Sequence, residues 1–390
     1  MHYLRLLRRP RHVASSPGVL HVELVLTITT DLGDSFLCPS DAISLRASAE
    51  VGSASYALSP PAQLQWAPGQ RVVKPRFMLP PAAVKAWASG QVLHICIKTA
   101  HDGLSAESLD SILESATDPN ASGLIMPLRV ALQGVADESG GEYSTRRLCW
   151  RRLRGAQACL DIDEEIGESI ARHVWDAGVV AVAALAGAHG LVKSTTGQHP
   201  LLRTVMQMLD AAGPGLNLLE LGCGVGILGL GLGAIVSRPC TLLMTDVDEA
   251  AGACTLSNLA RAEQSPAVKL SYEMLDWEVA KRGQFGPQVR HRPWHLIMLS
   301  DCTYNADALP ALVGTLTALS AANSRHTHGD HGFITRVLVA MKPRHASEIA
   351  FFHLMEAQGW TALVERQLFQ LPEIGRESGS VEMHLFEKES

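Results

Sequence analysis

The stretch that decides the fold reads Asn217-Leu-Leu-Glu-Leu-Gly222-Cys-Gly224-Val-Gly226-Ile-Leu-Gly229. Its apolar first half predicts a buried strand, and its apolar second half predicts a helix after a glycine-rich turn. Glycine lets the backbone adopt positive φ and approach a ligand closely. The free N–H groups at the start of the helix then face that ligand. We therefore predict a ligand site at the carboxyl end of a strand in an α/β sheet.

The same alternation of strands and helices continues from this stretch to the C-terminus. We expect strands at 217–221, 241–245, 268–274, 294–300 and 335–341, and helices at 166–186, 249–261, 309–322 and 346–358. Apolar strands that alternate with helices are typical of a parallel sheet covered on both faces. Two last runs, 362–369 and 381–386, flank a turn region and predict an antiparallel end to the sheet. The fold class is therefore α/β and Rossmann-like.

The chain before this α/β region has another pattern. Runs at 22–29, 92–98 and 123–132 are rich in β-branched and apolar residues, with Pro and Gly between them. Such runs predict a small sandwich or partly open barrel, so we expect a β-rich domain over residues 1–136. A polar, glycine-rich stretch follows. We take 137–163 as linker and lead-in, and 164–390 as the α/β domain.

The composition excludes several classes of protein. The chain has 390 residues, 47% of them hydrophobic, and a net charge of -6, which disfavours a non-specific nucleic-acid binder. Its most apolar stretches, 178–192 and 221–236, are shorter than the roughly 18 to 20 residues of a membrane span. We expect buried helices there and no membrane span.

Cysteine and histidine patterns give no metal site. The eight cysteines contain no C-x-x-C pair and lie in or beside apolar runs, which favours reduced thiols in a reducing compartment. The His-rich stretch 324–331 is interpreted as a polar loop rather than a metal site. The arginine-rich start of the chain leaves mitochondrial targeting open beside a cytoplasmic or nuclear location.

Glu220 indicates which ligand the glycine turn accepts. Gly224-x-Gly226-x-x-Gly229 also matches the dinucleotide fingerprint, which would suit an NAD-dependent oxidoreductase. A carboxylate two residues before the first glycine is badly placed beside a pyrophosphate, but it suits the ammonium of a methionine moiety. S-adenosylmethionine carries an ammonium and a sulfonium and no phosphate. We therefore predict S-adenosylmethionine as cofactor, with a capping or surface role for Glu220 as the alternative.

Polar residues at the ends of the next strands extend this site. Asp246 follows the second strand and is placed to accept both ribose hydroxyls, whereas Asp248 could cap the following helix. Asp276 follows the third strand and could accept the adenine amino group. Trp277 could cover the adenine face or simply belong to the core.

The fourth strand carries the candidate catalytic residues. It ends at Ser300, and Asp301 and Tyr304 follow at the edge where open α/β sheets bind ligands. They supply a carboxylate and a phenol three residues apart, beside the expected methyl group. Trp175 precedes the sheet, and helix packing would explain it equally well.

Taken together, these residues resemble one family, the seven-strand protein-lysine methyltransferases of the methyltransferase-like group (lysine methyltransferase family 16), whose fold is similar to that of nicotinamide N-methyltransferase. The resemblance covers about residues 162–386. Its motifs are Trp175-Asp-Ala-Gly, Glu220-Leu-Gly-Cys-Gly-Val-Gly, Thr245-Asp246, Asn258, Leu275-Asp-Trp277, Ser300-Asp-Cys-Thr-Tyr304, Lys342-Pro-Arg344 and the run Glu348–Met355.

The resemblance implies a pocket and a reaction. By it, the cofactor pocket would be lined by Trp175, Glu220, Gly222, Gly224, Gly226, Asp246, Asp276, Trp277 and Ser300. Asp301 and Tyr304 would lie at an acceptor amine, so the implied activity is methyl transfer to an amine, foremost a protein lysine, with that protein as partner. A small-molecule N-methyltransferase and an inactive cofactor-binding protein remain alternatives. The β-rich extension and the long basic loop 280–292 depart from short family members and leave the substrate open.

Overall fold

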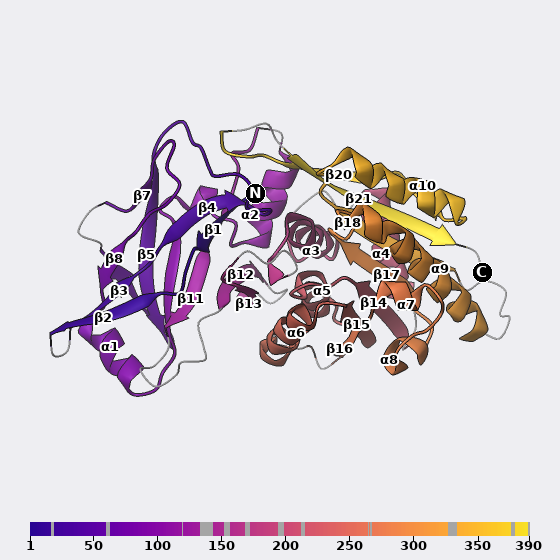
Figure 1. Cartoon of the computed structure of the whole chain (residues 1–390), viewed down its shortest axis with the longest axis horizontal. Helices are drawn as coiled ribbons and strands as arrows, with labels where there is room; N and C mark the ends of the chain where they lie inside the picture. The colour runs from indigo at the N-terminus through magenta and orange to yellow at the C-terminus, as the bar shows by residue number, and fades with distance from the viewer. Residues whose placement is uncertain are drawn as a thin grey trace. The chain divides into compact units, whose positions relative to one another are not determined.

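The computed structural model describes residues 1–16, 19–59, 63–118, 120–132, 143–151, 157–167, 172–193, 199–211, 215–263, 265, 267–326, 334–375 and 379–388. The chain forms two compact units. The first, called the N-terminal unit here, comprises Met1–Cys149, Asp161–His173 and Leu371–Ser378; the second, the C-terminal unit, comprises Trp150–Leu160, Val174–Gln370 and Gly379–Ser390. Figure 1 shows both units.

A mixed sheet forms the centre of the C-terminal unit. Its strand order is β16 (Val268–Met274), β15 (Cys240–Asp246), β14 (Leu216–Leu221), β17 (Leu296–Ser300), β18 (Thr335–Met341), β21 (Gly379–Lys388) and β19 (Thr361–Ala362), and β20 (Gln367–Leu371) also pairs with β21. The first five strands are parallel, and β21 runs antiparallel to β18. The predicted parallel sheet with an antiparallel end is confirmed.

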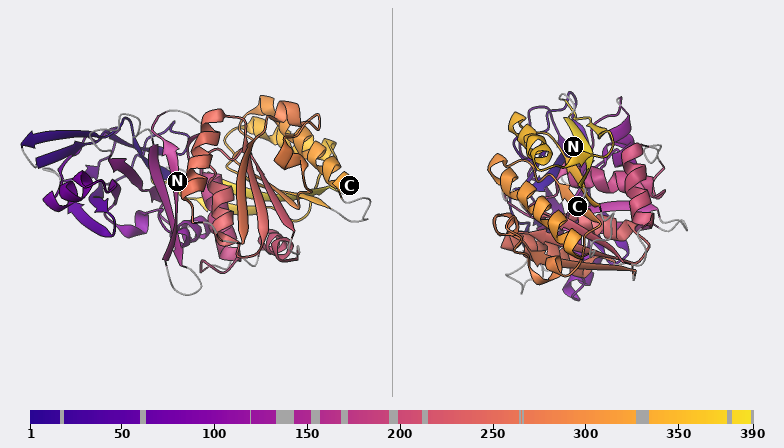
Figure 2. Two further views of the ribbon diagram at one scale, coloured as in Figure 1. Left: turned by 90° about the horizontal axis from the view of Figure 1, so that it is seen from below. Right: turned by 90° about the vertical axis from the view of Figure 1, so that its right-hand side faces the viewer.

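Helices cover both faces of this sheet (Figure 2). On one face α3 (Asp176–Ala188) packs against α4 (Pro200–Ala211) and α5 (Ile227–Ile235); on the other α9 (Leu309–His326) packs against α7 (Trp277–Ala280) and α10 (Ile349–Ala357). The remaining helices of the unit are α6 (Glu249–Arg261) and the short α8 (Pro287–Arg290). The helices predicted at 249–261, 309–322 and 346–358 are confirmed, whereas α4 was not predicted.

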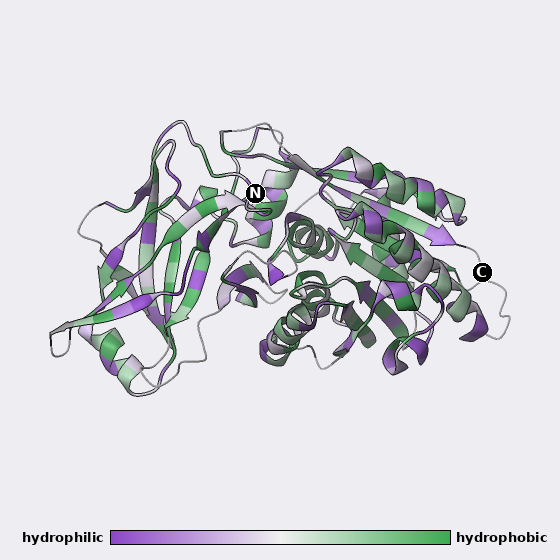
Figure 3. Cartoon of the chain, viewed as in Figure 1, coloured by the Kyte–Doolittle hydropathy of each residue, from purple (hydrophilic) through white to green (hydrophobic). Residues whose placement is uncertain are grey.

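The apolar stretches 178–192 and 221–236 contain the buried helices α3 and α5, as expected, although 221–226 forms the end of β14 and the glycine turn. Every residue of α3 from Asp176 to Gly187 is buried, and α3 and α5 are among the green, hydrophobic helices of Figure 3. On the opposite face, strand residues such as Leu219 and Leu299 form one core with Leu312 and Phe351 of α9 and α10. Each such side chain contributes about 1.5 to 3 kcal/mol. Within the part of the chain that the structure describes, no helix is both long and apolar enough to cross a bilayer.

The region before the C-terminal sheet is β-rich, as predicted, and its described residues, most of them in the N-terminal unit, form three sheets. The first sheet has the strand order β10 (Ile125–Met126), β1 (His2–Leu6), β4 (Leu26–Thr30). The second, seven-stranded sheet has the order β13 (Gln157–Glu165), β12 (Tyr143–Arg151), β11 (Leu128–Leu132), β9 (Leu93–Thr99), β5 (Ile43–Val51), β6 (Ala54–Leu58), and β7 (Gln65–Trp66) also pairs with β5. The third sheet has the order β2 (Arg11–Ser16), β3 (Val19–Glu23), β8 (Arg76–Met78). Leu4, Val22 and Ile95 of the three sheets belong to one core. Helices α1 (Pro81–Ala88) and α2 (Leu109–Thr117) were not predicted.

The stretch 137–163, expected as a linker and lead-in, holds two strands instead. β12 and β13 extend the seven-stranded sheet, and the helix expected from residue 166 starts only at Asp176. The expectation failed because these strands carry charges on their polar face, where Arg147 is paired with Asp161 at 2.7 Å. Alternation of charged and apolar residues is a strand pattern that the polar composition concealed.

The expectation of reduced thiols is wrong for one pair of cysteines. Cys149 on β12 and Cys159 on β13 are disulfide-bonded, and the other six cysteines form no disulfide. Side-chain contacts between Thr145 and Asp163 and between Arg147 and Asp161 set the register of the hairpin. The same spacing brings the two cysteines opposite each other, which their ten-residue separation did not reveal.

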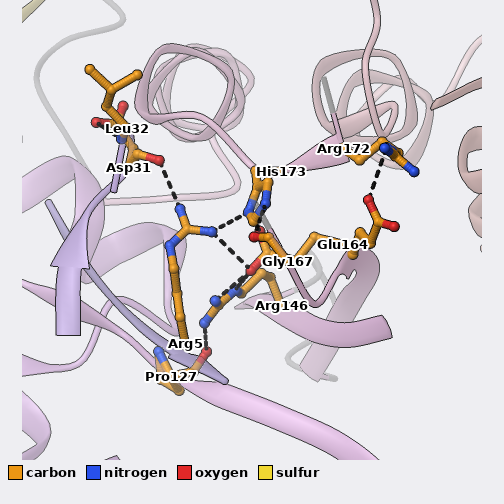
Figure 4. A network of polar contacts seen from close by, with 10 residues as sticks. Arg5, Asp31, Leu32, Pro127, Arg146, Glu164, Gly167, Arg172 and His173 are labelled. Carbon is orange, nitrogen blue, oxygen red and sulfur yellow. Dashed lines mark hydrogen bonds and ion pairs between the residues drawn. The ribbon is translucent and has the colours of Figure 1, made fainter. Parts of the chain in front are cut away.

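A charged cluster lies inside the N-terminal unit (Figure 4). The fully buried Arg146 donates to Glu164 at 2.8 Å and to the Pro127 carbonyl at 2.7 Å. Arg5 contacts the His173 ring and lies 3.7 Å from the same Glu164 carboxylate. Removing one partner of such a buried pair leaves the other charge buried without a counter-charge, which destabilises the fold. The cluster therefore joins β1, β12 and β13 inside this unit.

Candidate active site

The glycine turn after β14 has the conformation that the sequence predicts. Gly222, Gly224 and Gly226 all take positive φ, at 65°, 54° and 84°. Two side chains of α6 hold the turn: the Thr255 hydroxyl donates to the Gly224 carbonyl at 2.6 Å, and the Asn258 amide donates to the Val225 carbonyl at 3.0 Å. The turn is thus fixed from a helix that begins some twenty residues later in the chain.

Glu220 is a buried carboxylate beside this turn. Its side chain is fully buried, and apart from the backbone of Gly229 the described residues offer it no hydrogen-bond partner. Burial raises its pKa to about 8, while the Gly229 backbone acts in the opposite direction. A Cβ on Gly229 would lie 2.4 Å from Glu220 Oε2, so glycine is required there to leave room for the carboxylate. A buried carboxylate with no side-chain partner is costly and is therefore a candidate ligand for a cation.

Asp246 connects the end of β15 to the glycine turn. Its Oδ2 accepts from the Gly224 N–H at 2.8 Å, and its Oδ1 accepts from the Asp248 N–H at 3.0 Å. Burial raises its pKa, although these backbone donors oppose the rise. Asp248 itself caps α6, since its Oδ1 accepts from the Ala251 N–H at 2.6 Å. Of these two carboxylates, Asp248 is thus used as a helix cap and Asp246 as the contact to the glycine turn.

Trp277 and Cys302 enclose the first glycine of the turn. A Cβ on Gly222 would lie 3.2 Å from the Trp277 ring and 2.7 Å from Cys302 Sγ. The Cys302 thiol donates to the Leu221 carbonyl at 3.3 Å, and burial raises its pKa, so it stays protonated. Asp276, predicted at the adenine, is exposed and caps the short helix α7 by accepting from the Glu278 N–H at 2.8 Å. Sequence reasoning missed Cys302 as a wall of this site.

Asp301 lies at the end of β17 in an unusual backbone conformation. It is the single non-glycine residue with positive φ in the described chain, at 50°. Its carboxylate accepts from the Ala177 N–H at 3.0 Å and from the Lys342 N–H at 2.9 Å, and Arg344 lies 3.2 Å from it. Asp301 therefore joins the start of α3 to the end of β18. Such strain at a sheet edge is typical of functional sites.

The other motifs converge on this carboxylate. Lys342 forms a 2.8 Å ion pair with the buried Asp176 at the start of α3. The Arg344 guanidinium lies 4.9 Å above the centre of the Trp175 ring. Trp175 and Asp176 come from one end of the region and Lys342 and Arg344 from the other, yet they meet around Asp301.

Tyr304 is exposed, whereas Ser300 is half-buried against α3. Tyr304 is 55% exposed, and partial burial raises the pKa of its phenol, so the hydroxyl remains protonated at neutral pH. The Ser300 hydroxyl would lie 3.4 Å from a Cβ on Gly178 of α3. The structure therefore brings the ends of β14, β15 and β17 together, with an exposed phenol beside them.

The N-terminal unit contains a groove, but its charges are already paired. The groove has a volume of about 40 Å³ and lies on the polar face of the seven-stranded sheet. Arg129 lies 3.0 Å from Glu50 and 3.3 Å from Asp161, and Lys98 lies 2.9 Å from Glu107. Among the described residues, no group of three or more possible metal ligands occurs in either unit. Most of the His-rich stretch 324–331 lies outside the described residues.

The side chains around the glycine turn of the C-terminal unit fit S-adenosylmethionine. A carboxylate without a side-chain partner, Glu220, would suit its ammonium, the Asp246 carboxylate would suit its ribose hydroxyls, and the Trp277 ring beside Gly222 would suit its adenine. The turn between them carries no basic side chain that could pair with a phosphate. Fold and site thus define a Rossmann-like domain of the class that includes the S-adenosylmethionine-dependent methyltransferases.

The chain belongs to the lysine methyltransferase family, whose model matches residues 155–358. It is 26% identical over 222 residues to a UPF0665 family protein of Schizosaccharomyces pombe, a match that covers 56% of this chain and 57% of that protein. The chain thus spans a little over half the length of this curated relative. Family membership sets aside the dinucleotide interpretation of the glycine turn.

Solved structures with a similar arrangement include two from archaea. One is a SAM-dependent methyltransferase from Methanosarcina mazei, with a TM-score of 0.33 and 8% identity over 49% of this chain and 97% of that chain. Another is Pyrococcus horikoshii TYW2 in complex with MeSAdo, with a TM-score of 0.28 and 14% identity over 49% of this chain and 64% of that chain.

Proposed function

We propose that this protein transfers a methyl group from S-adenosylmethionine to the side-chain amine of a lysine in another protein. The observation that carries the proposal is Glu220, a fully buried carboxylate without a side-chain partner beside a glycine turn. The description of the family as lysine methyltransferases supports the choice of acceptor. The β-rich N-terminal unit, which adds a large surface outside the matched catalytic region, agrees with a macromolecular substrate.

Three residues of this chain would hold the cofactor. Glu220 binds the ammonium, and because burial keeps its pKa near 8, it must release a proton to do so near neutral pH. Asp246 accepts the ribose hydroxyls while it holds the glycine turn closed. Trp277 covers the adenine beside Gly222. When bound, S-adenosylmethionine supplies an electrophilic methyl group on a sulfonium centre.

The acceptor amine must arrive uncharged and in line with that methyl group. For a lysine with a pKa near 10.4, losing the proton at pH 7 costs about 4 to 5 kcal/mol. An apolar entrance lowers this cost because it disfavours the ammonium form. We assign Tyr304 as a wall and orienting hydroxyl of the entrance. Asp301, whose two oxygens accept from the backbone N–H groups of Ala177 and Lys342, sets the backbone from which Tyr304 projects.

A small-molecule amine is the second candidate acceptor, since a site of this chemistry accepts any neutral amine that reaches it. The two acceptors differ in size, so the labelled product distinguishes them. Tritiated methyl transfer into a lysate of cells lacking the protein should label protein bands, and mass spectrometry should place the methyl groups on lysine. Label in small molecules alone would reverse the assignment.

The residue roles are tested in the same assay. Tyr304→Phe removes only the hydroxyl, and Asp301→Ala removes the carboxylate that joins α3 and β18. We expect each to lower the rate at saturating cofactor by about tenfold or more. Asp307→Asn, on the exposed part of the same loop, should not change it. Full activity of both test variants would refute the assignment.

A further inference from the structure

A buried hydrogen bond joins two loops at the carboxyl edge of the C-terminal sheet. The Thr303 hydroxyl donates to Glu348 Oε2 at 2.9 Å. Thr303 follows β17, and Glu348 lies in the short 3-10 helix that follows β18. Both side chains are almost completely buried, with exposed fractions of 1% and 3%. The two loops start from neighbouring parallel strands, so this bond ties adjacent parts of the sheet edge.

Helix capping explains only half of what Glu348 does. Its Oε1 accepts from the backbone N–H groups of Arg344 at 2.8 Å and His345 at 3.0 Å, which completes a capping box at the start of its own helix. That role needs one oxygen. The second oxygen reaches across to Thr303 in the other loop, a contact that capping does not require.

Each of these buried residues is followed by an exposed apolar side chain. Tyr304 comes directly after Thr303 and is 55% exposed, and Ile349 comes directly after Glu348 and is 60% exposed. A single exposed apolar side chain is common on protein surfaces. These two are distinguished by their place: each directly follows one partner of the buried hydrogen bond at the carboxyl edge of the sheet. The buried bond fixes the backbone of both loops, and therefore the spacing of the two side chains.

We propose that the Thr303–Glu348 hydrogen bond is a positioning device that holds Tyr304 and Ile349 as two walls of the acceptor entrance. The inference rests on the proposed methyl transfer and deepens it by naming the acceptor chemistry. Two apolar walls fit an amine at the end of a flexible alkyl stem, as in lysine, and fit poorly an amine on a charged or strongly hydrated body. Thr303 and Glu348 act through these walls and do not touch the substrate.

Substitutions of Thr303 separate positioning from folding. Thr303→Val keeps the shape and removes the hydroxyl, whereas Thr303→Ser keeps the hydroxyl and removes the methyl group. Thr303→Val loses a hydrogen bond to a buried carboxylate, so we expect kcat/KM for tritiated-methyl transfer into lysate protein to fall by about tenfold. Most of this fall should come from a higher concentration of lysate protein needed for half-maximal rate. Thr303→Ser should retain at least half of the wild-type value, and the Kd for S-adenosylmethionine should stay within about twofold in both variants.

The apolar walls are tested by a matched pair of charges. Ile349→Glu should lower transfer into protein by about tenfold or more, because a charge replaces an apolar wall. Leu256→Glu changes an apolar residue of α6 that is 49% exposed and should have no effect.

The outcomes separate this inference from the proposed function. If the wild-type protein labels no amine, the proposed function fails. If the wild-type protein is active and Thr303→Val equals it, or Thr303→Ser is as poor as Thr303→Val, the positioning role is wrong. If Ile349→Glu retains full activity, or Leu256→Glu loses as much activity as Ile349→Glu, the assignment of Ile349 as a wall of the acceptor entrance is wrong.

Discussion

Replacing Glu220 with glutamine should stabilise the cofactor-free protein while it removes the proposed cation ligand. The side chain is fully buried, and its pKa is raised from its usual 4.5 to about 8 because burial disfavours the charged form. Below about pH 4.5 the carboxyl is protonated in the folded and unfolded chains alike. As the pH rises further, the unfolded chain releases a proton that the folded chain retains, and stability is lost until the pH passes about 8.

The size of this effect follows from the two pKa values. Each pKa unit corresponds to about 1.36 kcal/mol, so the loss reaches roughly 3 kcal/mol at pH 7 and roughly 5 kcal/mol above pH 8. Glutamine stays neutral and avoids this loss. The expected difference in unfolding free energy between Glu220→Gln and wild type is therefore near zero at pH 4.5 and about 3 kcal/mol in favour of the variant at pH 7.

Denaturant unfolding of the cofactor-free full chain between pH 4.5 and 9 measures this difference. The chain has two compact units, so two transitions can occur, and the pH-dependent difference should be confined to the one from the C-terminal unit. A constant offset between variant and wild type over this whole range would refute the reasoning. So would a variant that becomes relatively less stable as the pH rises.

Three further changes test other parts of the structure. Asp246→Asn should weaken binding of every adenosine ligand by about tenfold or more in calorimetry, because an amide oxygen cannot replace both acceptors that hold the turn; unchanged affinity would contradict this. Gly229→Ala should cost about 1 to 3 kcal/mol in unfolding, since its Cβ would lie 2.4 Å from a Glu220 oxygen; a variant of wild-type stability would show that the carboxylate can move away. Glu164→Gln should destabilise the N-terminal unit by about 3 to 5 kcal/mol, because it leaves the fully buried Arg146 without its counter-charge. If the unfolding transition of the N-terminal unit does not change, the pair does not stabilise this unit.

The C-terminal sheet could be predicted because its strands are short apolar runs that end in polar residues. Glu220 and Asp246 mark the ends of β14 and β15 within one residue, and Asp248 combines with the following acidic residue to mark the start of α6. Such signals are local, so a single sequence contains them. The N-terminal unit was read less well. Its strands β12 and β13 alternate charged and apolar residues, and the polar composition of this stretch was interpreted as that of a linker.

The arrangement around Asp301 could not be derived from local patterns. Its partners come from the start of α3 and from the segment after β18, more than one hundred residues apart in the chain. Sequence reasoning assigned Asp301 directly to the acceptor, whereas the structure shows both of its oxygens engaged by backbone N–H groups. The contact between Thr303 and Glu348 was missed for the same reason: only the paired strands β17 and β18 bring the two loops together.

Calorimetry with two ligands tests most directly whether Glu220 binds the ammonium of the cofactor. S-adenosylmethionine carries that group, and 5′-methylthioadenosine has the same nucleoside and sulfur without it. At pH 8 we expect Glu220→Gln to raise the Kd for S-adenosylmethionine by roughly tenfold to a hundredfold, the range of a charge-assisted hydrogen bond. The Kd for methylthioadenosine should stay within about twofold of the wild-type value. Equal losses for the two ligands, or undiminished binding of S-adenosylmethionine, would contradict the account.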